Sequence, residues 1–292
     1  MESNAGGRHP GPLVRPAGER RADGTIQRIR PTDAGWTWVS FDAWRLAPGV
    51  RVERPGDGHE VLVLVLEGTA SVTVGGVMLG RVGTRASVFE APPAGVVLCA
   101  PGEDVEVVAE TPVLLAIAAA PGGDVHRTAV IAPATILVET RGEGPSERMI
   151  KNLLPPTAEA GRLIAVEAYT PGGNWSSYPP HKHDTDDPPN ESQLEELYFY
   201  RFARPTGFAV QRVYTADRSL DETMTAVDLD VILVPRGYHV VGAAAGYDTW
   251  YLNIMAGPTR VWRFTVDPDH AWLMNWDPTR PRPGADETAA TR

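Results

Sequence analysis

The sequence predicts an all-β protein built from two similar halves, and three observations support this prediction. The chain of 292 residues holds 29 glycines and 27 prolines, which is typical of many tight turns. Its apolar residues fall in short β-branched runs between these turns, and helical spacing is scarce. The length is about twice that of one usual domain. Hydrophobic residues make up 42% of the chain, enough for a globular core.

The first half, expected to span 25–140 after a flexible tail at 1–24, carries strand patterns at close spacing. They lie at 60–69, 70–76, 86–93, 95–102, 105–110 and 113–118, and residues 125–140 are expected to be partly extended. Short strands separated by turn residues in this way are typical of a sandwich or barrel.

The second half, expected to span 161–279, also carries short strand patterns separated by turn residues. Its strand patterns lie at 163–170, 195–202, 207–215, 230–235 and 250–257. Between the halves, residues 141–160 are polar, contain prolines and show little strand pattern, so they are predicted to be a linker. Residues 280–292 are predicted to be a second flexible tail.

A weak internal repeat relates the two halves. Residues 97–102 (VLCAPG) align on residues 232–237 (ILVPRG), and each is a short apolar strand that ends in a Pro/Gly turn. The match is too short to establish duplication alone. Combined with the chain length, it favours two β-sandwich or β-barrel domains in tandem.

Charge and cysteine content exclude several classes of function. The 27 basic and 37 acidic residues give a net charge of −10, which disfavours nucleic acid and anionic membranes as partners. The one cysteine, Cys99, excludes an intramolecular disulfide and a multi-thiolate metal site, and its apolar surroundings predict a buried thiol.

The first twenty residues lack a signal-peptide pattern, and the longest apolar run, 113–120, is too short to span a membrane. We therefore expect a cytoplasmic protein.

The residues that can carry chemistry are concentrated in the second half. His181 and His183 are two positions apart, so in an extended chain both imidazoles face the same side. Glu195 and Glu196 begin the next strand pattern, and His239 follows a Pro/Gly turn. A lone His-x-His pair in a β-rich protein is more often a surface feature, but these elements in this order are uncommon by chance. They predict a site for a first-row divalent metal.

These motifs resemble the cupins, small β-barrels whose first motif carries His-x-His and Glu and whose second carries a Pro/Gly turn and His. Within the cupins, the sequence is similar to the 5-deoxy-glucuronate isomerases of inositol catabolism. The similarity is densest over 161–276 and lies in GNWSSYPPHKHD (173–184), EELYFYRF (195–202), GFAVQRVYT (207–215), VPRGYHVV (234–241) and WYLNIMAG (250–257). It implies a tandem cupin (bicupin), with two jelly-roll-like β-barrels in one chain.

The resemblance also implies one metal site and one barrel without a site. The implied ligands are His181, His183, Glu196 and His239, and Zn, Mn, Fe, Ni and Co suit this donor set equally. Strand alternation puts neighbouring glutamates on opposite faces and does not decide which one binds, while alignment on the E-x-Y-x-Y strand favours Glu196 over its neighbour. The first half has no His-x-His pair, and its His59 is expected at a loop or strand edge.

The activity that the resemblance implies is the interconversion of the aldose 5-deoxy-D-glucuronate and the ketose 5-dehydro-2-deoxy-D-gluconate through an enediol(ate). The substrate, a small anionic sugar acid, needs a cation for its carboxylate. Arg212 is the first candidate for this cation, and Lys182 is the second. Arg212 and Tyr251 are also expected to be catalytic residues. Asn253 is expected to contact the substrate, and the sequence does not identify the general base beyond Glu195 as one possibility.

Alternative functions are isomerisation of a related uronate, 5-keto-4-deoxyuronate, iron-dependent oxygenation, and sugar binding without catalysis. A homo-oligomer is expected, because tandem cupins commonly associate. No redox cofactor is expected, because the sequence contains neither a GxGxxG motif nor a phosphate-binding loop.

Overall fold

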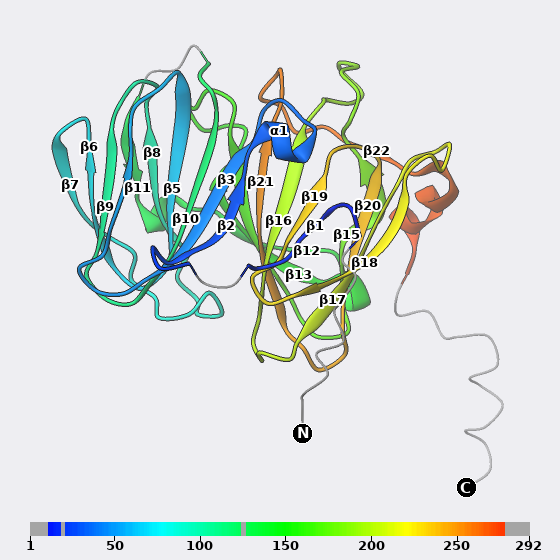
Figure 1. Ribbon diagram of the computed structural model, residues 1–292. Helices are drawn as coiled ribbons and strands as arrows, with labels where there is room; N and C mark the ends of the chain where they lie inside the picture. Colours follow the sequence, from blue (N-terminus) through cyan, green and yellow to red (C-terminus); the bar gives the residue numbers. More distant parts are fainter. Residues whose placement is uncertain (1–10, 19–20, 124–126, 278–292) are drawn as a thin grey trace, which may run out of the picture.

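The structure of the protein, a computed structural model, describes residues 11–18, 21–123 and 127–277. Four antiparallel sheets lie side by side, two from each half of the chain (Figure 1). The all-β prediction is confirmed. Residues 1–10 of the first expected tail, and the whole of the second at 280–292, lie outside the described residues. No helix in the described part of the chain is both long enough and apolar enough to cross a membrane.

The first half folds into a sandwich of two sheets. In spatial order, the larger sheet consists of β11 (Ala129–Ile131), β8 (Gly95–Cys99), β5 (His59–Glu67), β10 (Val113–Pro121), β3 (Ser40–Leu46) and β2 (Thr25–Ile29). The smaller sheet consists of β4 (Arg51–Arg54), β9 (Val105–Ala109), β6 (Ala70–Val74) and β7 (Val77–Val82).

The second half has the same two-sheet construction. Its larger sheet consists of β1 (Val14–Arg15), β19 (Val231–Val234), β16 (Glu195–Phe202), β21 (Thr249–Ala256), β14 (Ile164–Thr170), β13 (Arg148–Leu154) and β12 (Val138–Arg141). Its smaller sheet consists of β18 (Asp221–Val227), β17 (Phe208–Tyr214), β20 (Tyr238–Ala243), β15 (Trp175–Lys182) and β22 (Thr265–Val266). Short helical segments are α1 (Pro31–Ala34), η1 (Pro133–Thr135), η2 (Gly144–Ser146) and η3 (Pro268–Asn275).

The two halves share one strand order through most of their larger sheets. The order β8-β5-β10-β3-β2 in the first half corresponds to β19-β16-β21-β14-β13 in the second. Residues 97–99 lie on β8 and residues 232–234 on β19, so the two copies of the weak internal repeat occupy equivalent strands.

Three apolar layers separate the four sheets. One fills each sandwich, and the third and largest lies between the two larger sheets. The run at 61–66 is apolar throughout because its alternate positions serve two layers: Val63 faces the interior of the first sandwich, and Leu64 faces the second half. Across this inter-half layer, the rings of Phe41 and Phe199 lie 5.5 Å apart. The two halves therefore share a core.

Two glutamates at equivalent strand ends join the halves reciprocally. At the start of β16, the Glu195 carboxylate accepts hydrogen bonds of 2.6–3.2 Å from the backbone N–H groups of residues 37–39 in the first half. In β5, the Glu60 carboxylate accepts from the backbone N–H groups of residues 161–163 in the second half. Each buried carboxylate is satisfied by the other half of the chain, so neither is free for chemistry.

Two segments differ from the sequence-based expectation because they complete the larger sheet of the second half. Residues 141–160, expected to be a linker, contain β13, which pairs with β14. Within the expected tail at 1–24, β1 pairs with β19. Both strands satisfy backbone groups that would otherwise lie at sheet edges. We therefore propose that the second domain includes β12 and β13 and begins before residue 138.

Residues 86–93, expected to be a strand, form turns instead. Pro92 and Pro93 cannot donate backbone hydrogen bonds to a sheet. The backbone N–H of Val88 donates to the Glu67 carboxylate at 3.2 Å rather than to a neighbouring strand. The buried side chain of Val88 nonetheless joins the inter-half layer, which explains the apolar pattern.

Cys99 provides a test of the packing in the first half. Its side chain is fully buried among the apolar residues of the first sandwich, and this burial, with the nearby charge of Glu103, raises the thiol pKa to about 12. Because only the thiolate reacts, we expect no labelling by a disulfide reagent at pH 8 in the folded protein. One thiol per chain should react after denaturation, and rapid labelling of the folded protein would contradict this packing.

Candidate metal centre

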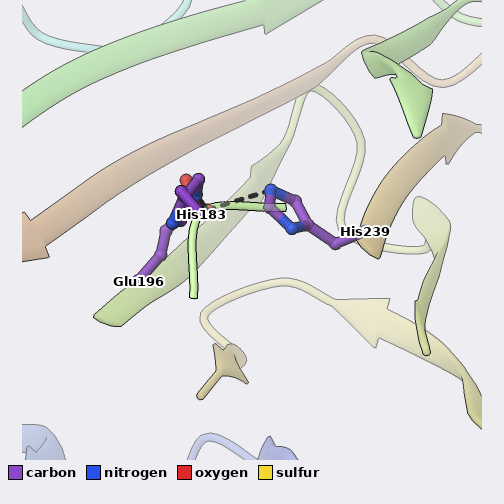
Figure 2. A group of neighbouring side chains, drawn as sticks. All are labelled: His183, Glu196 and His239. Atoms are coloured by element: carbon purple, nitrogen blue, oxygen red, sulfur yellow. Dashed lines mark hydrogen bonds and ion pairs between the residues drawn. The ribbon is translucent and has the colours of Figure 1, made fainter. Parts of the chain in front are cut away.

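Three buried side chains gather inside the second sandwich: His183, Glu196 and His239 (Figure 2). Each histidine places Nε2 at 3.1 Å from Oε2 of Glu196. The ligand atoms of the three residues all lie within 4.8 Å of one another, so a single ion could contact all of them. Among the residues that the structure describes, no second group of this kind is found.

Strand alternation in β16 separates the two candidate glutamates. Glu196 shares the inward face with Tyr198 and Tyr200, which pack in the interior of the second sandwich. Glu195 points to the opposite face, where the first half binds its carboxylate. Of the two glutamates, only Glu196 can reach the histidines.

Backbone carbonyl groups orient all three imidazoles of the predicted site. The ring Nδ1 atoms of His181, His183 and His239 lie 3.0, 3.0 and 3.3 Å from the carbonyl oxygens of Pro179, Leu194 and Gly237, respectively. Such a contact favours a proton on Nδ1, so that Nε2 is the atom that would bind a metal, which is the usual arrangement of a metal-binding histidine.

His181 lies beside the three buried residues and lines the adjoining cavity. Its ring centre is 4.7 Å from that of His239 and 6.3 Å from that of His183. It does not belong to the set whose ligand atoms lie within 4.8 Å of one another. Burial and the nearby His239 lower the pKa of His181 to about 3, so its imidazole is neutral at physiological pH.

The electrostatics of the group suit a cation. Burial acts to raise the pKa of Glu196, but His239 and His183 overcome this effect and hold the pKa below its ordinary range. The carboxylate is therefore ionised. Nε2 of His239 is buried and makes no hydrogen bond, although it lies close to the carboxylate. An unsatisfied buried nitrogen that faces a carboxylate is rare in folded proteins, and a bound metal ion would satisfy both.

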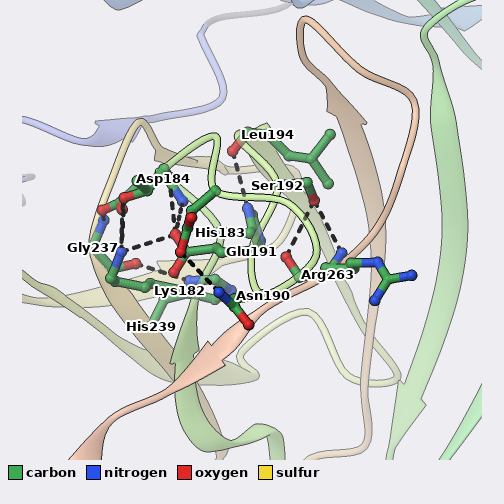
Figure 3. Close-up of polar contacts among 12 residues, drawn as sticks. Lys182, His183, Asp184, Asn190, Glu191, Ser192, Leu194, Gly237, His239 and Arg263 are labelled. Atoms are coloured by element: carbon green, nitrogen blue, oxygen red, sulfur yellow. Dashed lines mark hydrogen bonds and ion pairs between the residues drawn. The ribbon is translucent and has the colours of Figure 1, made fainter.

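The acidic loop after His183 holds the histidine-bearing segments together (Figure 3). Oε1 of the buried Glu191 accepts hydrogen bonds from Lys182 Nζ at 2.8 Å and from the backbone N–H groups of Asp184 and Thr185 at 2.9 Å each. Oδ2 of Asp184 accepts from the backbone N–H of Gly237 at 2.7 Å. The loop thus connects the strand of the His-x-His pair to the turn that precedes the third histidine.

Gly237 is required in this turn. Its φ is +93°, a region that side chains with a Cβ rarely adopt. A Cβ there would also lie 2.5 Å from the backbone oxygen of Tyr214. The Pro/Gly turn found in the sequence therefore places His239 through a backbone shape that only glycine allows.

A cavity of about 180 Å³ adjoins the group. It is smaller than the roughly 300–1,000 Å³ of sites for drug-sized ligands, which suits a small metabolite. Its lining includes His181, Glu196, Tyr198, Tyr251, Asn253, Arg141, Arg148, Ser177, Trp262 and Phe264.

Two of the four residues predicted to bind or act on the substrate line this cavity. The hydroxyl of Tyr251 donates to Ser176 Oγ at 2.8 Å. Asn253 Nδ2 donates to Glu196 Oε1 at 2.6 Å, so its clearest role is to orient the carboxylate and leave Oε2 facing the histidines.

The two predicted cations lie elsewhere. Arg212 pairs through two hydrogen bonds with Asp221, at 2.9 and 2.8 Å, on the outer face of β17, because the flanking Gln211 and Val213 point inward. Lys182 pairs with Asp184 and Glu191 and does not line the cavity. The roles expected of these two residues therefore need other side chains.

Sequence reasoning missed Arg141, Arg148 and Tyr198, which line the cavity. The two arginines lie at the ends of β12 and β13, where they pair directly across the strands. The signal that could have found them is the Gly/Pro/Ser-rich segment 142–147 between two extended stretches, which is typical of a hairpin.

The equivalent position in the first half carries no ligand. Val61 pairs with Cys99 on β8 as Glu196 pairs with Val234 on β19, so an apolar residue occupies the glutamate position. The interior there is filled by apolar side chains. His59 lies at the start of β5, with its side chain 35% exposed and Nδ1 2.9 Å from Asp57.

The two sandwiches, their matching strand order and the buried His–Glu–His group in one of them define a bicupin with one candidate metal centre. A family model described as KduI/IolB matches residues 13–273. The chain belongs to this family.

Curated relatives and solved structures agree with this assignment. Proteins named 5-deoxy-glucuronate isomerase from Geobacillus kaustophilus and Listeria monocytogenes are 44% and 41% identical to this chain. The alignments cover 90% and 91% of this chain and 95% and 98% of those proteins. An IolB-like protein from Salmonella typhimurium LT2 superposes with a TM-score of 0.87 at 44% identity, covering 90% of this chain and 99% of that one.

A more distant structure supports the fold alone. An oxalate decarboxylase mutant from Bacillus subtilis superposes with a TM-score of 0.61 at 12% identity, covering 89% of this chain and 80% of that one. The tandem-cupin fold expected from the sequence is confirmed.

Proposed function

We propose that this protein is an aldose–ketose isomerase that converts 5-deoxy-D-glucuronate into 5-dehydro-2-deoxy-D-gluconate in myo-inositol catabolism. The observation that carries this proposal is the buried His183–Glu196–His239 group beside a small cavity. Relatives at 40–45% identity that are named for this reaction support the choice of substrate.

The reaction moves hydrogen between neighbouring carbons and needs no external oxidant or reductant. A proton leaves C2 of the aldose, its electron pair forms the C1–C2 double bond of an enediolate, and the C1 carbonyl oxygen takes up the charge. Reprotonation at C1, together with transfer of the C2 hydroxyl proton to the C1 oxygen, gives the ketose with no net gain or loss of protons. The site must therefore stabilise negative charge on oxygen and handle protons.

The donor set fits one divalent ion, which His183, Glu196 and His239 would hold, and the neighbouring His181 would be the fourth ligand. Three imidazoles and a carboxylate suit Zn, Mn, Fe, Ni or Co. Such an ion would supply Lewis-acid stabilisation of the developing oxyanion. Asn253 would keep Glu196 in position through its hydrogen bond to Oε1.

Two buried tyrosines supply neutral hydrogen-bond donors at the cavity wall. Burial raises the pKa of Tyr251, so its phenol remains protonated at physiological pH and could donate to a substrate oxygen in place of Ser176 Oγ. Tyr198 is also buried with a raised pKa, and its hydroxyl lies 2.9 Å from Ser177 Oγ. Apolar side chains such as Phe264 line another part of the cavity.

Metal-dependent turnover tests the proposal directly. The metal-loaded protein, incubated anaerobically with 5-deoxy-D-glucuronate, is expected to form the ketose, followed by NMR, at least 100-fold faster than chelator-treated protein. Anaerobic turnover also excludes an oxygenase. Turnover no faster than the chelator-treated control would overturn the isomerase proposal. Faster conversion of 5-keto-4-deoxyuronate in a parallel assay would reassign the substrate.

Two further expectations concern the setting of the reaction. We propose that the protein acts in the cytoplasm on this small anionic substrate, as a homo-oligomer. Val77 and Met78 on β7 are each 63% exposed, and apolar side chains at this sheet edge would suit a contact between subunits. Sedimentation of the full chain measures the assembly.

A further inference from the structure

Two arginines face each other at the side of the cavity formed by β12 and β13. Arg141 and Arg148 are directly opposite in the antiparallel ladder, and both line the cavity. Like charges placed directly opposite on neighbouring strands destabilise a sheet. This pair is therefore costly for the protein alone and favours a bound anion.

The two arginines differ in how far their charge is already neutralised. Arg141 contacts the Glu139 carboxylate at 2.5 and 3.0 Å, and its guanidinium lies 5.5 Å from the ring centre of Trp262. Arg148 donates to the backbone oxygen of Ser146 at 2.9 Å and forms no ion pair with a carboxylate among the described residues.

Arg148 is partly buried, so its charge is only partly stabilised by solvent. Burial, with a contribution from Arg141, lowers its pKa against the opposing influence of Tyr251 and Tyr198. A guanidinium remains protonated in proteins. A partly buried cation beside phenol hydroxyls, without a carboxylate partner, has donors left for a ligand carboxylate.

The distance between Arg148 and the candidate metal centre suits a ligand that carries a functional group at each end of its carbon chain. In the larger sheet, β13 is the third strand from β16, which carries Glu196. Strands are spaced about 4.8 Å apart, so the two backbones are about 14 Å apart, and both side chains reach into the same cavity. A six-carbon sugar acid has its carbonyl and its carboxylate at opposite ends of the chain.

We propose that Arg148, assisted by Arg141, binds the carboxylate of the substrate and makes the cavity selective for a sugar acid over the corresponding neutral sugar. The aldehyde end then lies at the His183–Glu196–His239 group. This inference rests on the proposed function, and it assigns to Arg148 the role that the sequence predicted for Arg212.

Binding to metal-free protein tests the carboxylate contact without turnover. Calorimetry of chelator-treated protein with 5-deoxy-D-glucuronate is expected to give a Kd that rises about 10- to 100-fold in Arg148→Gln, as for loss of a charged hydrogen bond. Arg148→Lys should lie in between, because lysine keeps the charge but not the two-pronged geometry. Arg212→Gln is the matched control and should bind like the wild type.

Specificity provides a second readout that a general loss of folding would not produce. The wild type should prefer the acid to the same aldose with CH₂OH in place of the carboxylate, measured as a ratio of kcat/KM. In Arg148→Gln this preference should fall about 10- to 100-fold, mainly through KM for the acid, with metal content and circular dichroism unchanged.

Wild-type affinity and preference in Arg148→Gln, or equal losses in Arg212→Gln, would overturn the assignment of Arg148. The proposed function is tested separately. A wild type that binds the acid through Arg148 but does not isomerise it would overturn the isomerase function and leave the carboxylate contact in place. Failure of the metal-free wild type to bind the acid would also count against the Arg148 contact.

Discussion

Replacement of His183 by alanine is expected to remove both the bound metal and the isomerase activity. The side chain is 2% exposed and Nε2 lies 3.1 Å from the Glu196 carboxylate, so alanine would leave the site one ligand short. Loss of an outer-shell partner typically weakens metal affinity 10- to 100-fold, and loss of a direct ligand should exceed this. We expect less than a tenth of the wild-type metal content after gel filtration, and turnover reduced at least 100-fold.

Two variants make this result specific. Asn253→Ala removes the hydrogen bond to Glu196 Oε1 and a longer one to the backbone oxygen of Leu197, but no ligand atom, so its metal affinity should fall within the 10- to 100-fold range. His59→Ala alters a histidine of the first half, at the edge of a barrel without ligands, and should keep full metal content and activity. Full metal occupancy in His183→Ala, measured by plasma mass spectrometry, would mean that the ligand assignment is wrong.

Replacement of Glu167 by alanine is expected to reduce the free energy of unfolding by about 3–5 kcal/mol. Glu167 and Arg85 are each 1% exposed and form a two-pronged ion pair between the halves. Lys151 Nζ lies 3.8 Å from the same carboxylate, and burial lowers its pKa while Glu167 acts to raise it. Without Glu167, two buried cations would lose their shared counterion, which is more costly than the loss of the pair itself.

Urea denaturation followed by tryptophan fluorescence measures this effect. The control is Glu159→Ala, which removes an ion pair of 2.8 Å with Arg127, where both side chains are more than 60% exposed. Exposed pairs contribute about 0–1 kcal/mol, so the midpoint should hardly move. Replacing Arg85 and Glu167 together by methionine and leucine should recover only part of the lost stability, because Lys151 remains buried without its counterion. A Glu167→Ala protein as stable as the control would contradict the buried network.

Local patterns in the sequence were sufficient for most of the fold. Alternating and continuous apolar runs reflect what each strand face contacts, so residues 60–69 and 195–202 predict strands without tertiary information. The Pro/Gly turn predicts a sharp change of direction, because Gly237 needs its positive φ. The two-residue strand β1 was missed because its pairing with β19, distant in the sequence, stabilises it, and β13 was missed because its pairing with β14 outweighs its weak strand pattern.

The candidate site, like the fold, was predicted only in part from the sequence. The sequence by itself determined the His-x-His pair, the glutamate pair and the third histidine, because spacing and order are local properties. Only the tertiary structure decided that Glu196 faces the histidines while Glu195 binds the first half, since both faces of β16 are buried. It also placed Arg148 at the cavity and Arg212 outside it. Which face of a strand looks inward depends on register and on packing partners, and neither is encoded in a single stretch of sequence.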